Sequence, residues 1–134
     1  MSGRRKSRSI ELPGIQHRSP LPMGARVGRM LYSSGIPGLD PATGQLPAGA
    51  AAQAAQAFAN MKALLQAGGA TLDDVVRLTV FIGAEEHRRL VDPLWLECFP
   101  DPHDRPARHI LVYEHLKNGM VIQLEVVAEC EDDG

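Results

Sequence analysis

The stretch RPARHILVYEHLKNGMVIQLEVVAE, residues 105–129, decides the fold, because it predicts two apolar strands joined by a short loop. β-Branched and apolar residues occupy positions 110–112, and a turn rich in polar residues and glycine follows at 117–119. Apolar residues then alternate over 120–127, as expected of a strand. Arg108 stands at the head of the first strand, within otherwise apolar sequence.

Arg108 needs an anionic partner or an outlet to water, because burial of an unpaired charge is costly. Asp104 and Glu114 are the nearby carboxylates that could form a structural salt bridge with it. A planar guanidinium also suits a bidentate contact with a ligand carboxylate. Arg108 is therefore either a salt-bridged structural residue or an anion clamp, and both interpretations stay open on these residues alone.

The rest of the chain supplies the elements that surround this strand pair. In chain order we expect a short edge strand at 10–12, a hairpin at 26–33, a loop at 35–44, a helix at 47–67, a strand at 74–82 and a helical segment at 84–99. Pro93 should break the last segment near Asp92, which could cap a second short helix. This order predicts an α+β fold, a mixed β-sheet covered on one face by two helices.

Length and composition indicate one domain and exclude several function classes. With 134 residues we expect a single domain at 10–131, preceded by a flexible basic arm at 1–9 and followed by an acidic tail at 132–134. The near balance of 14 basic and 16 acidic residues argues against nucleic-acid binding as a function. No apolar run is long enough for a membrane span or a signal peptide, so a cytoplasmic protein is expected. The five histidines and two cysteines lack metal-ligand spacing, and no phosphate-binding motif follows the glycine-rich loop, so we expect no metal and no cofactor.

Several separated segments agree with one known family. They are Ala107-Arg108, the run Ile122-Gln123-Leu124-Glu125, and residues 30–47 and 51–82. In these segments the chain resembles the Rid family, the reactive intermediate deaminases also called the YjgF family. The resemblance implies a chorismate-mutase-like fold and a homotrimer with a barrel-like core and three intersubunit clefts. Two helices can cover only one sheet face, so a partner for the other face is compatible with the pattern.

The resemblance also implies roles for individual residues. Arg108 corresponds to the arginine that holds the carboxylate of a small imino or enamino acid, and Ser34 and Gly35 match a serine-glycine pair at the site. Gln123 stands where many members have a glutamate that activates water. An amide can position a water but cannot accept its proton, and a general base typically contributes about 10²–10⁴-fold. Glu125 shares the strand face of Gln123 and could substitute, although a solvated or salt-bridged role is the alternative.

Two further positions depart from the family pattern, and one more is expected in the cleft. Leu21 replaces a tyrosine, which removes a hydroxyl and an aromatic wall. Asp92 corresponds to an asparagine, and its carboxylate would repel an anionic ligand nearby unless it serves only as a helix cap. We expect Leu21, Asp92 and Ile110 to contribute to substrate binding together with Arg108, Ser34 and Gly35.

Two functions from different classes follow. The first is a cofactor-independent hydrolase, a 2-iminoalkanoate or 2-aminoacrylate deaminase in which Arg108 and Gln123 are catalytic and the products are a 2-oxo acid and ammonia. The second is a weakened or inactive homologue that binds a small carboxylate metabolite in the intersubunit cleft. A third, the family's historical endoribonuclease activity, is disfavoured by the acidic net charge and the few aromatic residues.

Overall fold

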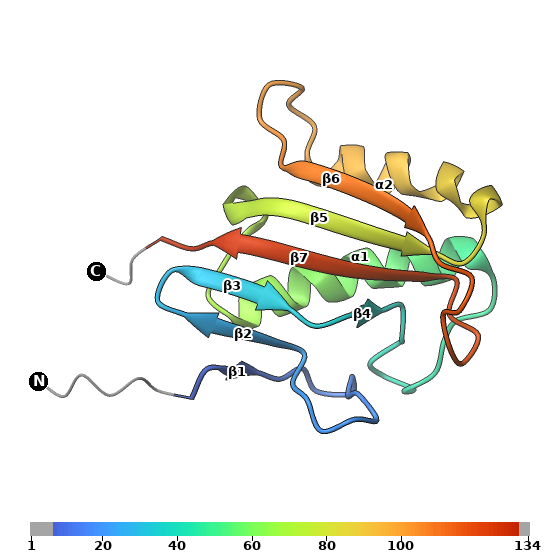
Figure 1. Cartoon of the computed structure of the whole chain (residues 1–134), viewed down its shortest axis with the longest axis horizontal. Coiled ribbons are helices and arrows are strands. Elements are labelled where there is room, and N and C mark those ends of the chain that lie inside the picture. Colours follow the sequence, from blue (N-terminus) through green and yellow to red (C-terminus); the bar gives the residue numbers. More distant parts are fainter. Residues whose placement is uncertain (1–6, 132–134) are drawn as a thin grey trace, which may run out of the picture.

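The chain forms one mixed sheet with both α-helices on the same side (Figure 1). The computed structural model describes residues 7–131, so the acidic tail at 132–134 and most of the predicted basic arm lie outside the described residues. The strands are β1 (Ser9–Ile10), β2 (Gly24–Val27), β3 (Met30–Ser33), β4 (Ile36–Pro37), β5 (Val75–Ile82), β6 (Ala107–Val112) and β7 (Ile122–Glu129). The helices are α1 (Ala50–Ala67) and α2 (Val91–Cys98), with 3-10 turns at Leu72–Asp74 and Glu85–Leu90. The predicted α+β class is confirmed.

The sheet order corrects one expectation about the decisive stretch. The strands follow the order β1-β2-β3-β7-β5-β6, and β4 pairs with β7 beside this path. Strands β6 and β7 are thus not neighbours, because β5 lies between them, parallel to β6 and antiparallel to β7. The connection at 113–121 is long enough to pass the end of β5, since neighbouring strands lie only about 4.8 Å apart. This crossing leaves β6 at the edge of the sheet in the described chain.

The N-terminal half follows the predicted pattern with small shifts. Strand β1 begins at Ser9, one residue before the predicted start of the domain, and pairs with β2. Strands β2 and β3 form the predicted hairpin with a two-residue turn, in which Gly28 adopts a φ of 60°. The expected loop at 35–44 contains a short strand instead, since Ile36 and Pro37 pair with β7. Helix α1 begins at Ala50 rather than at residue 47 and ends at Ala67, with Gly68 as its C-cap, as the glycine pair predicts.

The second helical segment breaks where a proline requires it, but without the predicted cap. A 3-10 turn ends at Leu90 and α2 starts at Val91, so Pro93 lies in the first turn, where its missing N–H is not needed. The N-cap of α2 is Leu90, and no side chain caps it. The interpretation of Asp92 as the helix cap is therefore wrong, because Asp92 lies one residue inside the helix.

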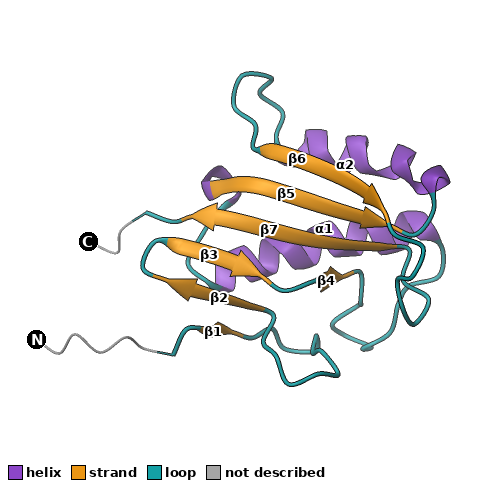
Figure 2. Cartoon of the chain, in the orientation of Figure 1, coloured by secondary structure: helices purple, strands orange, loops and turns teal. Residues whose placement is uncertain are grey.

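The two faces of the sheet differ sharply in cover. The helix-facing side chains of the central strands are fully buried, among them Leu78, Val80 and Ile82 of β5 and Leu124 and Val126 of β7. Figure 2 shows both helices behind the sheet in this view, and no helix crosses its front. On that open face Tyr32 of β3 and Leu111 of β6 remain exposed. The expected cover of one face by two helices is thus present, and the opposite face is open in the single chain.

Candidate functional site

Arg108 is held by the second helix rather than by the carboxylates expected from the sequence. Its Nη1 donates to Oδ1 of Asp92 at 2.8 Å, and the guanidinium carbon lies 4.8 Å from the centre of the Trp95 ring. Neither Asp104 nor Glu114 is its partner, so the salt bridge considered as an alternative is formed with a different carboxylate. Cation–π contact and a charge-assisted hydrogen bond together restrict the guanidinium, whose side chain is 25% exposed. Within residues 7–131 one of its nitrogens, Nη1, is engaged in this way, so further donors remain for a ligand.

Gln123 lies on the opposite face of the sheet from Arg108. In β7 its neighbours Ile122 and Leu124 are buried against the helices, so Gln123 points to the open face. Arg108 stands beside Leu78, which faces the helices, and Ile110 shares that face and packs against the core. A single chain therefore does not bring Arg108 and Gln123 together.

Gly35 and Gln123, in contrast, are in direct contact. A Cβ added at Gly35 would lie 2.5 Å from Nε2 of Gln123, so a larger residue there would displace the amide from this position. Ser34 is anchored within its own chain, because its hydroxyl donates to the Pro22 carbonyl at 2.8 Å. The hydroxyl oxygen of Ser34 can still accept a hydrogen bond from a ligand.

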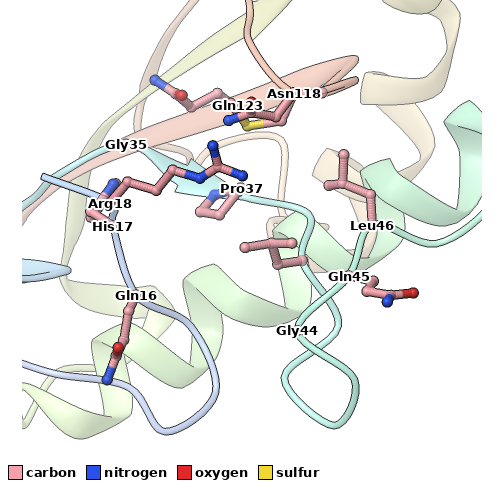
Figure 3. Close-up of a pocket in the computed structure, with 12 residues that line it drawn as sticks. Gln16, His17, Arg18, Gly35, Pro37, Gly44, Gln45, Leu46, Asn118 and Gln123 are labelled. Carbon is pink, nitrogen blue, oxygen red and sulfur yellow. The ribbon is translucent and has the colours of Figure 1, made fainter.

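A pocket of about 430 Å³ lies in front of Gln123 (Figure 3). Its walls come from the segment at 16–18, the region around β4, and the turn before β7. An adjoining hollow of about 510 Å³ includes Leu21 and Tyr113. The residues common to both are His17, Arg18, Asn118, Met120 and Gln123. Of the predicted site residues, the two hollows thus bring together Leu21, Gly35 and Gln123, but not Arg108, Asp92, Ser34 or Ile110.

Two buried polar side chains of α1 hold the pocket walls. The Asn60 amide donates to the carbonyls of Pro37 and Leu39, both at 2.8 Å. Gln53 bonds the other wall, donating to the Gly119 carbonyl and accepting from the Val121 N–H. Because buried amides must be satisfied, these bonds fix the β4 region and the turn before β7 relative to the helix.

The charge of the two hollows is entirely basic. Arg18 lines both, Lys117 and His115 line the second, and neither includes an aspartate or glutamate. Nε2 of His17 is buried and has no hydrogen-bond partner within residues 7–131. Arg18 was missed from the sequence, because the segment at 16–19 has no periodicity and belongs to no motif, and Asn118 was predicted only as part of the turn at 117–119. The sequence did contain one indication of Arg18, because a basic residue stands three positions before Leu21, which was expected in the cleft.

Other chemistries receive no support from the described residues. Between residues 7 and 131, no group of three His, Cys, Asp or Glu side chains could hold a metal ion. Burial raises the pKa of the Cys98 thiol, which disfavours the nucleophilic thiolate. No helix in this part of the chain has the length and apolarity needed to cross a membrane.

The chain has an α+β fold with a pocket in front of Gln123, and comparisons with known proteins give its family. The model of the family described as endoribonuclease L-PSP matches residues 16–130. The 2-iminobutanoate/2-iminopropanoate deaminase of Escherichia coli K12 is 33% identical over 111 residues, which cover 81% of this chain and 86% of that protein. The crystal structure of the E. coli YjgF gene product has a TM-score of 0.83 at 29% identity and covers 93% of this chain and 100% of that one. E. coli TdcF with bound serine also has a TM-score of 0.83, at 25% identity, covering 92% and 98%. The chain belongs to the endoribonuclease L-PSP family, the YjgF and Rid proteins that its sequence resembles.

Proposed function

We propose that the protein is a Rid-type deaminase that hydrolyses a small 2-imino or 2-enamino acid to a 2-oxo acid and ammonia. The observation that carries the proposal is the state of Arg108, whose guanidinium stacks on the Trp95 ring and, within residues 7–131, donates to Asp92 through Nη1 alone. A restricted guanidinium with free donors is suited to bind a carboxylate without a large loss of side-chain entropy. The deaminase name of the E. coli K12 relative supports the same reaction class.

A second chain would complete the site. Arg108 and Gln123 lie on opposite faces of the sheet, so the clamp of one chain can meet the water site only of another. The exposed Tyr32 and Leu111 on the open face and the free edge of β6 support such an assembly. We propose a homotrimer with the site in each intersubunit cleft, for which light scattering should give three times the mass of the chain.

The reaction needs few groups once the carboxylate is held. Arg108 would bind the substrate carboxylate, and the side-chain oxygen of Gln123 would accept a hydrogen bond from water and orient it toward the imine carbon. Water adds to that carbon, its protons pass to the nitrogen, and the carbon–nitrogen bond breaks to release ammonia and leave the 2-oxo acid. Gln123 cannot take the proton itself, so the substrate nitrogen is the acceptor in this scheme. Proximity and orientation would supply the rate acceleration.

A specific observation favours a second candidate, a homologue that binds a small carboxylate without turnover. Asp92 already occupies one nitrogen of Arg108 and would repel an incoming carboxylate. Gln123 removes the base at the same time. Binding without reaction would then be the function of the cleft.

The test compares 2-oxo acid production from imines generated in situ, using the unsubstituted protein, Arg108→Ala and Gln123→Glu. The matched control is Arg89→Ala, an exposed arginine outside the pockets. The deaminase proposal expects loss of the acceleration in Arg108→Ala, with unchanged circular dichroism and no loss in Arg89→Ala. Background rates in all four proteins would refute it and leave the binding function, which calorimetry with 2-oxobutanoate would then test.

A further inference from the structure

Arg18 is an exposed arginine that lines the pocket and that the proposed reaction does not use. It extends from the segment before Leu21, and its guanidinium end reaches into the space that Pro37 and Gln123 line (Figure 3). Within residues 7–131 the side chain makes no ion pair, whereas Arg88 and Arg108 each pair with a carboxylate. An arginine is available here for an anion from outside the chain.

The groups around Arg18 suit an anion as well. Asn118 and Gln123 line the same pocket and carry amide N–H donors. No carboxylate lines either hollow, so nothing there neutralises Arg18. A pocket with only basic charge attracts and retains anionic ligands.

The pocket also extends well beyond the water site. Gln123 is common to both hollows, and each exceeds 400 Å³, which leaves room for more than a substrate's reacting carbon. Arg18 lines both hollows together with Gln123, so a ligand bound at Gln123 can also reach Arg18. If the side chain of that ligand were apolar, the guanidinium of Arg18 would remain unpaired beside it. An acidic side chain would form charge-assisted hydrogen bonds instead.

We propose that Arg18 is a specificity-determining residue that binds the distal carboxylate of a dicarboxylic 2-imino acid or of the corresponding 2-oxo acid. The inference rests on the proposed function in one respect, that Arg108 from a neighbouring chain holds the carboxylate next to the reacting carbon. Arg18 then holds the second carboxylate, in the pocket that it lines together with Gln123.

The experiment uses two probes that differ only in this second group. 2-Oxoglutarate and 2-oxopentanoate have the same five-carbon chain, and the terminal carboxylate of the first is a methyl group in the second. Isothermal titration calorimetry of both acids would be run on the unsubstituted protein and on Arg18→Gln. Lys62→Gln serves as the control, because it removes one positive charge from an exposed position of α1 away from the pocket.

The expected result is selective loss of one ligand. The unsubstituted protein and Lys62→Gln should bind 2-oxoglutarate about tenfold more tightly than 2-oxopentanoate, the effect of one charge-assisted contact at a partly exposed site. Arg18→Gln should remove this preference and leave 2-oxopentanoate binding within about twofold, since the neutral tail makes no bond to Arg18. Equal binding of the two acids, binding of neither, or an equal loss of both in Arg18→Gln would overturn the inference.

The two proposals fail separately. If imine hydrolysis depends on Arg108 but Arg18→Gln does not discriminate between the acids, the proposed function stands and the inference falls. If no imine is hydrolysed but Arg18→Gln loses 2-oxoglutarate selectively, the deaminase proposal falls and the dicarboxylate site stands.

Discussion

Substitution of Asp92 by asparagine should raise the affinity of Arg108 for carboxylates. The Asp92 carboxylate accepts from Nη1 of Arg108 at 2.8 Å, and its charge opposes any second anion at the guanidinium. Asparagine keeps a side-chain oxygen that can accept the same hydrogen bond but removes the charge. The perturbation is therefore electrostatic, with little change of shape.

The size of the effect follows from the exposure of the pair. The Asp92 side chain is 69% exposed and that of Arg108 is 25% exposed, so solvent screens much of the interaction. Pairs of this kind contribute about 0–1 kcal/mol, and the partial burial of Arg108 favours the upper end. Asp92→Asn should accordingly lower the free energy of unfolding by no more than about 1 kcal/mol. If the Arg108 donor released from the charged Asp92 contributes the same free energy to binding a carboxylate ligand, the affinity rises by up to about fivefold.

Calorimetry with 2-oxobutanoate measures the change, and urea unfolding measures the stability. Asp73→Asn is the matched control, since Asp73 is exposed and lies five residues before Leu78, the neighbour of Arg108 in the sheet. The gain should shrink at high ionic strength, where the remaining charges are screened. An affinity equal to or below that of the unsubstituted protein would refute the reasoning, because Asp92 would then not compete with the ligand. Arg108 would in that case be a structural residue joining β6 to α2.

Two further predictions concern the pocket floor and the buried thiol. Gly35→Ala should destabilise the protein by about 1 kcal/mol, the low end for overpacking because the Gln123 amide can move aside, and should weaken 2-oxobutanoate binding. The control is Gly83→Ala, because a Cβ added at Gly83 would meet no atom closer than 3.7 Å. Equal destabilisation by the two substitutions in urea unfolding would contradict the contact between Gly35 and Gln123. The pKa of the Cys98 thiol is raised by burial, so its contribution to stability is complete below the pKa of the unfolded thiol and is lost as the pH rises through the folded value. Iodoacetamide labelling of Cys98 should thus lag behind that of the urea-unfolded chain across neutral pH, and equal rates would contradict a protected thiol.

The helices and strands could be predicted from local sequence pattern, whereas the pairing of the strands in the sheet could not. Alternation in β7 and the glycine pair after α1 each act within a few residues, so the sequence predicts them directly. The position of β5 between β6 and β7 depends on pairing across many residues, and a short connection made the two later strands look adjacent. A two-residue strand such as β4 carries too little pattern to separate it from a loop.

In the candidate site, too, individual residues could be predicted from the sequence but their contacts could not. Arg108 could be singled out because a charge in an apolar strand needs a partner, but that partner lies on a helix 16 residues earlier. Sequence distance favoured Asp104 and Glu114, while the packing of α2 against β6 brings Asp92 and Trp95 to the guanidinium. Gly35 and Gln123 were expected at the site, yet their mutual contact depends on the pairing of β4 with β7. Arg18 lies in an irregular segment, where specificity residues on a rigid scaffold often occur.

Gln123 and Arg18 change the pocket in the same electrostatic direction. An amide at position 123 leaves the guanidinium of Arg18 without a carboxylate in the pocket, whereas a glutamate there would attract it. The Gln123→Glu variant therefore combines two opposed effects, a base for water and a competitor for the distal carboxylate of the ligand. For a monocarboxylic imine only the first effect operates, so its turnover should rise. For a dicarboxylic imine the gain should be offset by a higher KM, because the new carboxylate and the substrate would compete for Arg18. Gln123 is thus required for Arg18 to bind a second carboxylate of the ligand, and slower activation of water is the consequence.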